Sequence, residues 1–346
     1  MQDYDRSIIR LLDANMNRAA EGLRVLEESA RMLFDDAGLS ANAKEIRHAL
    51  AEAVRSDPSL DRLLPFARDA EEDVLKAGMT PSENTRVDIV SLLRANAKRT
   101  TEAIRALEEY GKLLSPALGS RFKDIRFAVY TLEQRLVGMA TRSELTAPQR
   151  LRLGFSFMVS QQTSKPVDIL AAARDLGAGY VSLNGGTSAD RTFNDIAIMW
   201  AAETRKTEIM LFIEHRLDIA LASGADGLFV SSDDISTGRC RHIGGGKLVL
   251  GYSVEPDSFP SDAPDDIDLF VLIREDLDKL PNPHEVVPPK SHLPFVVRGS
   301  WSPEQLERAD LSATDGLLIE TYSPAGTLTP LSLSSLRPVL ERIRVR

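Results

Sequence analysis

One stretch of this sequence occurs twice. It reads Asp13-Ala-Asn-Met-Asn-Arg-Ala-Ala-Glu-Gly-Leu-Arg-Val-Leu-Glu-Glu28 in the first copy and Arg94-Ala-Asn-Ala-Lys-Arg-Thr-Thr-Glu-Ala-Ile-Arg-Ala-Leu-Glu-Glu109 in the second. The second copy follows the first at an offset of 81 residues, with these identical pairs: Asn15 and Asn96, Arg18 and Arg99, Glu21 and Glu102, Arg24 and Arg105, Leu26 and Leu107, Glu27 and Glu108, Glu28 and Glu109. A later segment repeats at an offset of 79, where Lys44, Ile46, Arg47 and Ala49 match Lys123, Ile125, Arg126 and Ala128. A unit of two segments therefore occurs twice.

The first segment of each unit has the periodicity of an amphipathic helix. Residues 6–34 contain no proline. At about 100° per residue, the apolar positions fall within roughly 60° of Asn15 on the helical wheel: Ile8, Leu12, Ala19, Leu26, Ala30 and Leu33. Two such units predict a duplicated helical bundle with approximate internal two-fold symmetry.

Asn15 is a polar residue within this apolar stripe, and Asn96 occupies the equivalent position in the second copy. A buried amide is costly unless it is hydrogen-bonded. Asn15, Arg18, Asn96 and Arg99 are therefore candidate ligand-binding residues in a polar cleft, with arginines suited to phosphate. An Asn–Arg–Glu network that only fixes the helix register is the alternative.

A charged connector bounded by prolines and glycine, residues 65–81, separates the two units. It contains the candidate site residues Arg68 and Asp69, and either covers a cleft or is an exposed crossover. The polar stretch Thr141–Gln149 breaks the helical periodicity. We therefore expect a helical domain over residues 1–140, a linker over 141–151 and a second domain over 152–346.

The second domain alternates short β-rich runs with helical patterns. The runs are Leu153–Val159, Tyr180–Leu183, Glu208–Ile213, Gly227–Ser231, Lys247–Tyr252, Asp268–Ile273, Phe295–Arg298 and Gly316–Glu320. The helical patterns include Val167–Leu176, Asp195–Thr204, Arg216–Ser223, Pro303–Ala309 and Leu331–Ile343. This order predicts an α + α/β protein whose second half is a (β/α)8 TIM-type barrel, with a doubly wound open sheet as the alternative. We expect the barrel to be irregular after strand 5, because Pro256–Pro264 is a weak helix and Pro281–Pro294 is a proline-rich loop.

The loops that follow the strands of such a barrel carry its function. Asp234 follows the fourth run and is a candidate Mg²⁺ ligand, since Mg²⁺ prefers carboxylates and phosphate, or alternatively the N-cap of the next helix. His215 beside Glu214 either does acid–base work or is an ordinary histidine at a helix start. Ser253 follows the fifth run and is a candidate substrate- or phosphate-binding residue.

Composition limits the classes of function. The net charge is 42 − 51 = −9, which argues against nucleic-acid binding. A single cysteine, Cys240, excludes an intramolecular disulfide and fits a reducing cytoplasm. No apolar run is long enough to span a membrane, and the acidic first residues do not form a signal peptide.

The helical half resembles the hydroxymethylpyrimidine-phosphate kinase-type domain that precedes some thiamine phosphate synthases. The residues that carry this resemblance are Asp13–Arg24, Glu108-Glu-Tyr-Gly-Lys-Leu113 and Lys123-Asp-Ile-Arg126. In the connector, the arginine and both aspartates of the family pattern remain in Arg68-Asp-Ala-Glu-Glu-Asp73, but its Pro-Gly is absent. The resemblance implies a kinase that uses ATP as co-substrate together with Mg²⁺.

The barrel half resembles thiamine phosphate synthase, most clearly over Phe212–Asp234 and Leu250-Gly-Tyr-Ser253. The family joins phosphorylated pyrimidine and thiazole substrates, and Mg²⁺ stabilises the departing pyrophosphate. Asp234, at the metal-ligand position, and Ser253 match the family. The cationic clamp after strand 2 is replaced by Ser182-Leu-Asn-Gly-Gly186, the pair after strand 3 by Glu214-His215, the loop after strand 6 by Arg274–Lys279, and the glycine pair after strand 7 by Gly299-Ser300.

Together these observations favour a thiamine biosynthesis protein, with pyrimidine-phosphate kinase activity in the helical domain favoured over synthase activity in the barrel. The alternative is a noncatalytic binding or regulatory protein with a degenerate barrel. Phosphorylated pyrimidine and thiazole compounds are the expected partners, neither nucleic acid nor membrane is expected, and a homo-oligomer is left open.

Overall fold

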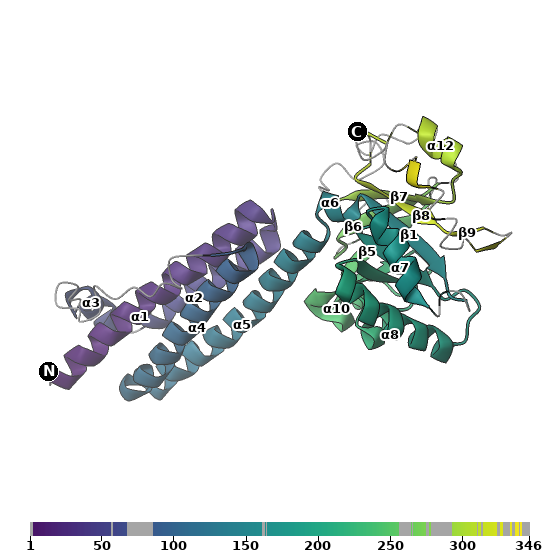
Figure 1. Ribbon diagram of the computed structural model, residues 1–346. Helices are drawn as coiled ribbons and strands as arrows, with labels where there is room; N and C mark the ends of the chain where they lie inside the picture. Colours follow the sequence, from purple (N-terminus) through teal and green to yellow (C-terminus); the bar gives the residue numbers. More distant parts are fainter. Residues whose placement is uncertain are drawn as a thin grey trace. The chain divides into compact units, whose positions relative to one another are not determined.

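The chain divides into two compact units, Met1–Thr141 and Arg142–Arg346, which are drawn in the computed structural model of Figure 1. The residues that the structure describes are 3–56, 58–67, 86–160, 163, 165–255, 264, 266–274, 277, 293–309, 311–312, 314–323, 326–327, 333, 336–338 and 340. None of the described helices is both long and apolar enough to cross a membrane.

The first unit is a bundle of helices that run side by side (Figure 1). Its elements are α1 Asp3–Glu28, the π-helical turn η1 Ser29–Leu33, α2 Ala37–Arg55, α3 Pro58–Ala67, α4 Ile89–Leu114 and α5 Pro116–Leu145. Asp36 caps α2 by accepting a hydrogen bond from Leu39 N, and Asp88 with Ser91 forms a capping box on α4. The helix expected over residues 6–34 thus ends in a π-helical turn, and α3 was not anticipated.

Helices α1 and α4 pack closely where Gly22 faces α4. A Cβ atom at Gly22 would overlap Thr100 Oγ1 and would lie 3.0 Å from the carbonyl oxygen of Asn96. The missing side chain therefore lets the two helices approach, as small residues do at close helix crossings. Asn96 and Thr100 belong to the second copy of the repeated stretch, so the two copies contact each other directly.

Matched residues of the two sequence units form matched ion pairs. Arg47 Nε lies 2.9 Å from Glu27 Oε2, and Arg126 Nη2 lies 2.9 Å from Glu108 Oε2. Each pair joins the first helix of a unit to its second helix. Glu27 and Glu108 are the buried first residues of the repeated Glu-Glu dipeptides. The repeated positions therefore include residues that determine how the two helices of each unit pack.

Replacement of Gly22 by alanine should destabilise the bundle, although alanine favours a free helix by about 1 kcal/mol over glycine. The new methyl group would overpack the contact with α4, which costs about 1–3 kcal/mol. Urea unfolding followed by far-ultraviolet circular dichroism measures the change.

The double variant Gly22→Ala/Thr100→Ala is the matched control, because it removes the overlapping hydroxyl. It should recover part of the lost stability. A Gly22→Ala protein that is more stable than the parent would show that α1 and α4 do not pack through this glycine.

The second unit is a closed barrel of eight parallel strands in the order β1 to β8. The strands are β1 Leu153–Met158, β2 Tyr180–Asn184, β3 Met210–Glu214, β4 Gly227–Val230, β5 Val249–Val254, β6 Leu269–Ile273, β7 Phe295–Gly299 and β8 Gly316–Glu320. All eight strand predictions are confirmed, and closure excludes the open-sheet alternative. A short antiparallel pair follows, β9 Tyr322–Ser323 and β10 Gly326–Thr327.

Helices surround the strands (Figure 1). They are α6 Pro148–Leu151, α7 Pro166–Asp175, α8 Asp190–Thr207, α9 Leu217–Ser223, α10 Thr237–Gly244, the short turn η4 Gly245–Lys247 and α12 Pro303–Arg308. Helix α8 starts five residues before its predicted start, and α10 was expected only as the helix that follows Asp234, without predicted bounds. The irregular stretches expected after strand 5, and most of the helix expected over Leu331–Ile343, lie outside the described residues.

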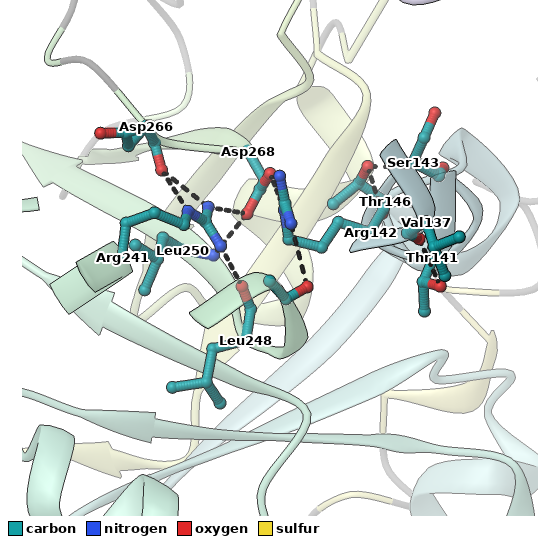
Figure 2. Close-up of polar contacts among 11 residues, drawn as sticks. Val137, Thr141, Arg142, Ser143, Thr146, Arg241, Leu248, Leu250, Asp266 and Asp268 are labelled. Carbon is teal, nitrogen blue, oxygen red and sulfur yellow. Dashed lines mark hydrogen bonds and ion pairs between the residues drawn. The ribbon is translucent and has the colours of Figure 1, made fainter. Parts of the chain in front are cut away.

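The last turn of α5 belongs to the barrel unit and is anchored by a buried ion pair. Arg142 Nε lies 2.9 Å from Asp268 Oδ1, and its Nη1 donates to the carbonyl oxygen of Gly246 at 2.9 Å. Arg241 Nη2 lies 2.6 Å from the other carboxylate oxygen, Oδ2, of Asp268, so two arginines share one carboxylate (Figure 2). Leu151 belongs to the barrel's inner cluster and Leu145 packs against it. Much of the expected linker 141–151 is therefore built into the amino end of the barrel.

Arg142→Ala should lower the barrel's unfolding free energy by about 1.5–3 kcal/mol, the range for hydrogen bonds to charged groups. Both tryptophans, Trp200 and Trp301, lie in the barrel, so tryptophan fluorescence in a urea titration reports on this unit. Arg239→Ala, an exposed arginine on α10, is the control and should change little. Equal stability of the two variants would show that Arg142 does not anchor α5 to the barrel.

Candidate functional site

A layer of polar side chains lies inside the carboxyl end of the barrel. Tyr180, Phe212 and Leu318 belong to the cluster that fills the barrel interior. Side chains alternate along a strand, so residues two positions later point the same way. The upper layer that results consists of Ser156 on β1, Ser182 on β2, Glu214 on β3, Ser253 on β5, Arg298 on β7 and Glu320 on β8.

Glu214 is the centre of this upper layer. It is 1% exposed, and its Oε1 accepts hydrogen bonds from Ser156 Oγ at 2.7 Å and Ser182 Oγ at 2.6 Å. Its Oε2 accepts from Asn184 Nδ2 at 2.9 Å and pairs with Arg298 Nη2 at 2.9 Å. Burial alone would raise the pKa of Glu214, but the charge of Arg298 and these hydrogen bonds together hold it below the usual glutamate value. Glu214 is therefore ionised at neutral pH.

Arg298 lies between two carboxylates. Besides Glu214, its Nε lies 2.7 Å from Glu320 Oε1, and the residue is 5% exposed. Among the described residues of the upper layer, two carboxylates face one guanidinium, which leaves an excess of negative charge there. Arg298 was missed as a site residue in the sequence, although an arginine inside the apolar run Phe295–Gly299 is a signal, because a buried charge needs a partner.

Three buried polar atoms of described residues near this end lack a hydrogen-bond partner, and the first is Ser160 Oγ, just after β1. The other two lie further along the chain. One is Ser253 Oγ, on a residue that is 6% exposed, and the other is Arg274 Nε, just after β6. Ser253 points inward with the upper layer. Arg274 follows the alternation of Leu272, which belongs to the outer cluster between strands and helices. Of these three residues, only Ser253 lies on a strand, in the inward alternation of the upper layer.

His215 and Asp234 form a pair at the rim. His215 Nδ1 lies 2.7 Å from Asp234 Oδ2, and the same oxygen accepts hydrogen bonds from Ser231 N at 2.8 Å and Ser231 Oγ at 3.0 Å. His215 has φ of 64°, a backbone conformation that is uncommon outside glycine. Asp234 is not the N-cap of α10, which is Ser236. Glu214 and His215 do not act as a pair, because one side chain is buried in the upper layer and the other contacts Asp234 in the loop after β4.

The predicted residues of the helical unit do not form one network. Asn15 Nδ2 and Asn96 Nδ2 each donate to a carbonyl oxygen of their own helix, Leu11 O and Leu92 O, both at 2.9 Å. Arg18 and Arg99 are exposed. The predicted Asn–Arg–Glu contact is therefore absent from the described contacts of these four side chains. Arg68 and Asp69 lie outside the described residues.

Comparison with known proteins relates both units to thiamine biosynthesis. Residues 10–135 match the ThiD2 family, and residues 156–263 match the family described as thiamine monophosphate synthase. The chain is 34% identical over 253 residues to thiamine-phosphate synthase of Rhodopirellula baltica, which covers 72% of this chain and 66% of that protein. It is 34% identical over 247 residues to thiamine-phosphate synthase of Synechocystis sp., covering 71% and 68%. The chain belongs to the thiamine-phosphate synthase family.

The chain spans about two thirds of the length of these curated relatives. Among solved structures, thiamine phosphate pyrophosphorylase from Pyrococcus furiosus matches with 18% identity and a TM-score of 0.45, covering 57% of this chain and 98% of that one.

Asp234 is not part of a cluster of metal-binding side chains among the described residues. Within them, no group of three or more histidine, cysteine, aspartate or glutamate side chains is placed to hold a metal ion. Oδ2 of Asp234 already receives three hydrogen-bonding contacts, and its neighbour His215 offers nitrogen, whereas Mg²⁺ prefers oxygen ligands.

Glu214→Gln should lower the barrel's unfolding free energy by about 3–5 kcal/mol at pH 7, because Arg298 loses a buried partner. The pKa of Glu214 is lowered in the folded protein, so the charge stabilises the fold above the unfolded pKa of about 4.3. This stabilisation is lost as pH falls through the folded pKa, so the gap between parent and variant should shrink below about pH 4.3. Urea titrations at pH 7 and at lower pH, followed by tryptophan fluorescence, measure the gap.

Glu208→Gln changes an exposed carboxylate just before β3 and is the control. It should leave the stability nearly unchanged at every pH. A gap between parent and Glu214→Gln that stays constant down to the acid limit would contradict an ionised Glu214.

Proposed function

We propose that this chain acts in thiamine biosynthesis through its helical unit, which phosphorylates hydroxymethylpyrimidine phosphate with ATP supplied as its magnesium complex. We propose further that the barrel does not join the pyrimidine and thiazole units. The relation to the ThiD2 family over residues 10–135 and to thiamine-phosphate synthases supports the pathway. The charges inside the barrel support the second half of the proposal, that the barrel does not catalyse the joining reaction.

Arg298 is the cation of the barrel's upper layer, and its charge is already paired with carboxylates. The joining reaction expels pyrophosphate, a highly charged leaving group that a catalytic site stabilises with cations or hydrogen-bond donors. Arg298 is paired with Glu214 at 2.9 Å and with Glu320 at 2.7 Å. Asn184 is occupied as well, because its Nδ2 donates to Glu214 and its Oδ1 accepts from Gly186 N at 2.9 Å. A layer with surplus negative charge opposes an anionic leaving group.

The exposed arginines favour the helical unit as the phosphate-handling part. Arg18 and Arg99 occupy matching positions on α1 and α4, and neither has a side-chain partner among the described residues. Guanidinium groups bind phosphate through two parallel hydrogen bonds. Arg18 and Arg99, together with Asn15, Asn96, Arg68 and Asp69, are the residues that we propose to bind the substrates.

The deciding experiment incubates the full chain with hydroxymethylpyrimidine phosphate, ATP, Mg²⁺ and thiazole phosphate, and detects the products by mass spectrometry. We expect pyrimidine diphosphate and no thiamine phosphate. Arg18→Ala and Arg99→Ala should each lower kcat/KM by about tenfold or more, which corresponds to about 1.4 kcal/mol of lost binding to the transition state.

Arg239→Ala is the matched control, because Arg239 is an exposed arginine of the barrel unit, and it should leave the kinase rate unchanged. Formation of thiamine phosphate would contradict an inactive barrel. Equal kinase rates for all three arginine variants would show that Arg18 and Arg99 do not belong to the substrate-binding site.

A noncatalytic regulatory protein is the second candidate. The observation in its favour is that Asn15 and Asn96 bond only to carbonyl oxygens of their own helices, so these two predicted residues do not meet in a shared polar centre. Absence of both products from a folded chain would select this candidate.

A further inference from the structure

Helices α1 and α4 lie side by side and run in opposite directions (Figure 1). Helix α2 returns along α1 and α5 returns along α4, as the matched ion pairs between them show. Arg121 Nη1, near the start of α5, donates to Ser56 Oγ, just after the end of α2. The start of α1 therefore lies at the same end of the bundle as the end of α4. The same contact places α2 and α5 on one side of the α1–α4 pair, so exposed residues of both helices emerge on the opposite side.

Arg18 and Arg99 lie at nearly the same level of this helix pair. Gly22 faces Asn96 and Thr100, so its level is midway between them. Because the helices are antiparallel, Arg18, four residues before Gly22, lies level with a point four residues after that middle. Arg99 is about three residues from this point, which is about 4.5 Å along the helix axis. With helix axes about 8–10 Å apart, the two arginine backbones are on the order of 10 Å from each other.

Both of these arginines are exposed and have no side-chain partner among the described residues. The neighbouring pair of repeated arginines differs in this respect. Arg24 Nη2 lies 2.6 Å from Glu28 Oε1. Arg105 Nη2 lies 2.9 Å from Glu109 Oε1. One pair of repeated arginines is thus satisfied within its own helices, whereas the other pair is available to a ligand.

Two guanidinium groups on one side of a helix pair suit a ligand with successive anionic groups. Each guanidinium binds a phosphoryl group through two parallel hydrogen bonds, and two contacts with one ligand reinforce each other. A phosphate chain offers a phosphoryl group to each arginine, whereas a monophosphate offers only one. Glu21 and Glu102 are also exposed on these helices, so a phosphate chain whose negative charge is reduced by bound Mg²⁺ suits this face better than a bare chain.

We propose that Arg18 and Arg99 together bind one phosphate chain, that of ATP in its magnesium complex, and that the pyrimidine monophosphate binds elsewhere on the helical unit. The inference rests on the proposed kinase function and assigns these two arginines to one of its two substrates. It requires a single phosphate-chain site in each protein chain, rather than one site at each copy of the repeat. The repeated positions supply the two halves of this site.

Isothermal titration calorimetry of the full chain with inorganic tripolyphosphate and Mg²⁺ tests the site. We expect one tripolyphosphate per chain, and binding at least about tenfold weaker for inorganic phosphate. Arg18→Ala and Arg99→Ala should each weaken tripolyphosphate binding by about tenfold and leave the stoichiometry at one. Two separate sites would instead give two tripolyphosphates per parent chain and one per variant chain at unchanged affinity, and this result overturns the proposal.

Arg24→Ala and Arg105→Ala are the matched controls, because they remove the same charge from the paired arginines of the same helices. They should bind tripolyphosphate as the parent does, and circular dichroism establishes that every variant is folded. In kinase assays, Arg18→Ala and Arg99→Ala should raise KM for ATP by about tenfold and leave KM for hydroxymethylpyrimidine phosphate unchanged. A rise confined to KM for the pyrimidine phosphate overturns the proposal.

Two further outcomes count against the shared site: no binding of tripolyphosphate, and an affinity that falls equally in the control variants. The binding and kinase measurements separate this inference from the proposed function. Tripolyphosphate binding that depends on both arginines, in a chain without kinase activity, would refute the proposed function and leave the phosphate-chain site standing. An active kinase whose KM for ATP is unchanged in both variants would do the reverse.

Discussion

The barrel depends on one buried carboxylate, that of Glu214. Its two oxygens receive hydrogen bonds or an ion pair from Ser156, Ser182, Asn184 and Arg298, which come from β1, β2 and β7. One side chain on β3 therefore connects strands from both sides of the closed sheet. Removal of any single donor leaves the other three in place, but removal of the carboxylate leaves all four donors without their acceptor. The layer is therefore cooperative, because its members depend on one shared acceptor.

The helical unit is organised by a different kind of interaction. Its ion pairs, Glu27 with Arg47 and Glu108 with Arg126, lie between neighbouring helices, and its closest helix contact is made through a missing side chain, at Gly22. In the barrel, the paired charges of Glu214, Arg298 and Glu320 lie inside the sheet. In the bundle, Arg18 and Arg99, which have no side-chain partner among the described residues, are exposed. The two units thus offer different chemistry to a ligand: exposed cations on one and enclosed carboxylates in the other.

The sequence predicts the strands well because each is a short β-rich run that is buried on both sides, as Leu211 and Phe212 show for β3. It does not predict the bounds of α10, whose eight residues contain Gly238 and Gly244 and have no clear apolar periodicity. It also does not predict the partners of Arg298, because Glu214 and Glu320 lie on other strands and meet Arg298 only when the sheet closes. The pairing of His215 with Asp234 was missed for the same reason, since local patterns suggested a role for each residue in its own loop. The duplication remains an interpretation of the sequence, although matched residues make matched contacts.

The two ends of the barrel differ in how completely their charges are paired, and this difference locates the ligand-binding end. At the amino end, both oxygens of Asp268 are occupied by Arg142 and Arg241, and Arg241 also donates to the carbonyl oxygens of Leu248 and Asp266 (Figure 2). Every acceptor in that cluster has a donor from the chain, so it holds the fold and offers nothing to a ligand. At the carboxyl end, Ser253 Oγ is buried without a partner, and Glu320 pairs only with Arg298 among the described residues. Because a folded chain rarely leaves buried polar atoms unsatisfied, the unpartnered buried atoms of this end, among them Ser253 Oγ, mark it as the end that is open to a ligand.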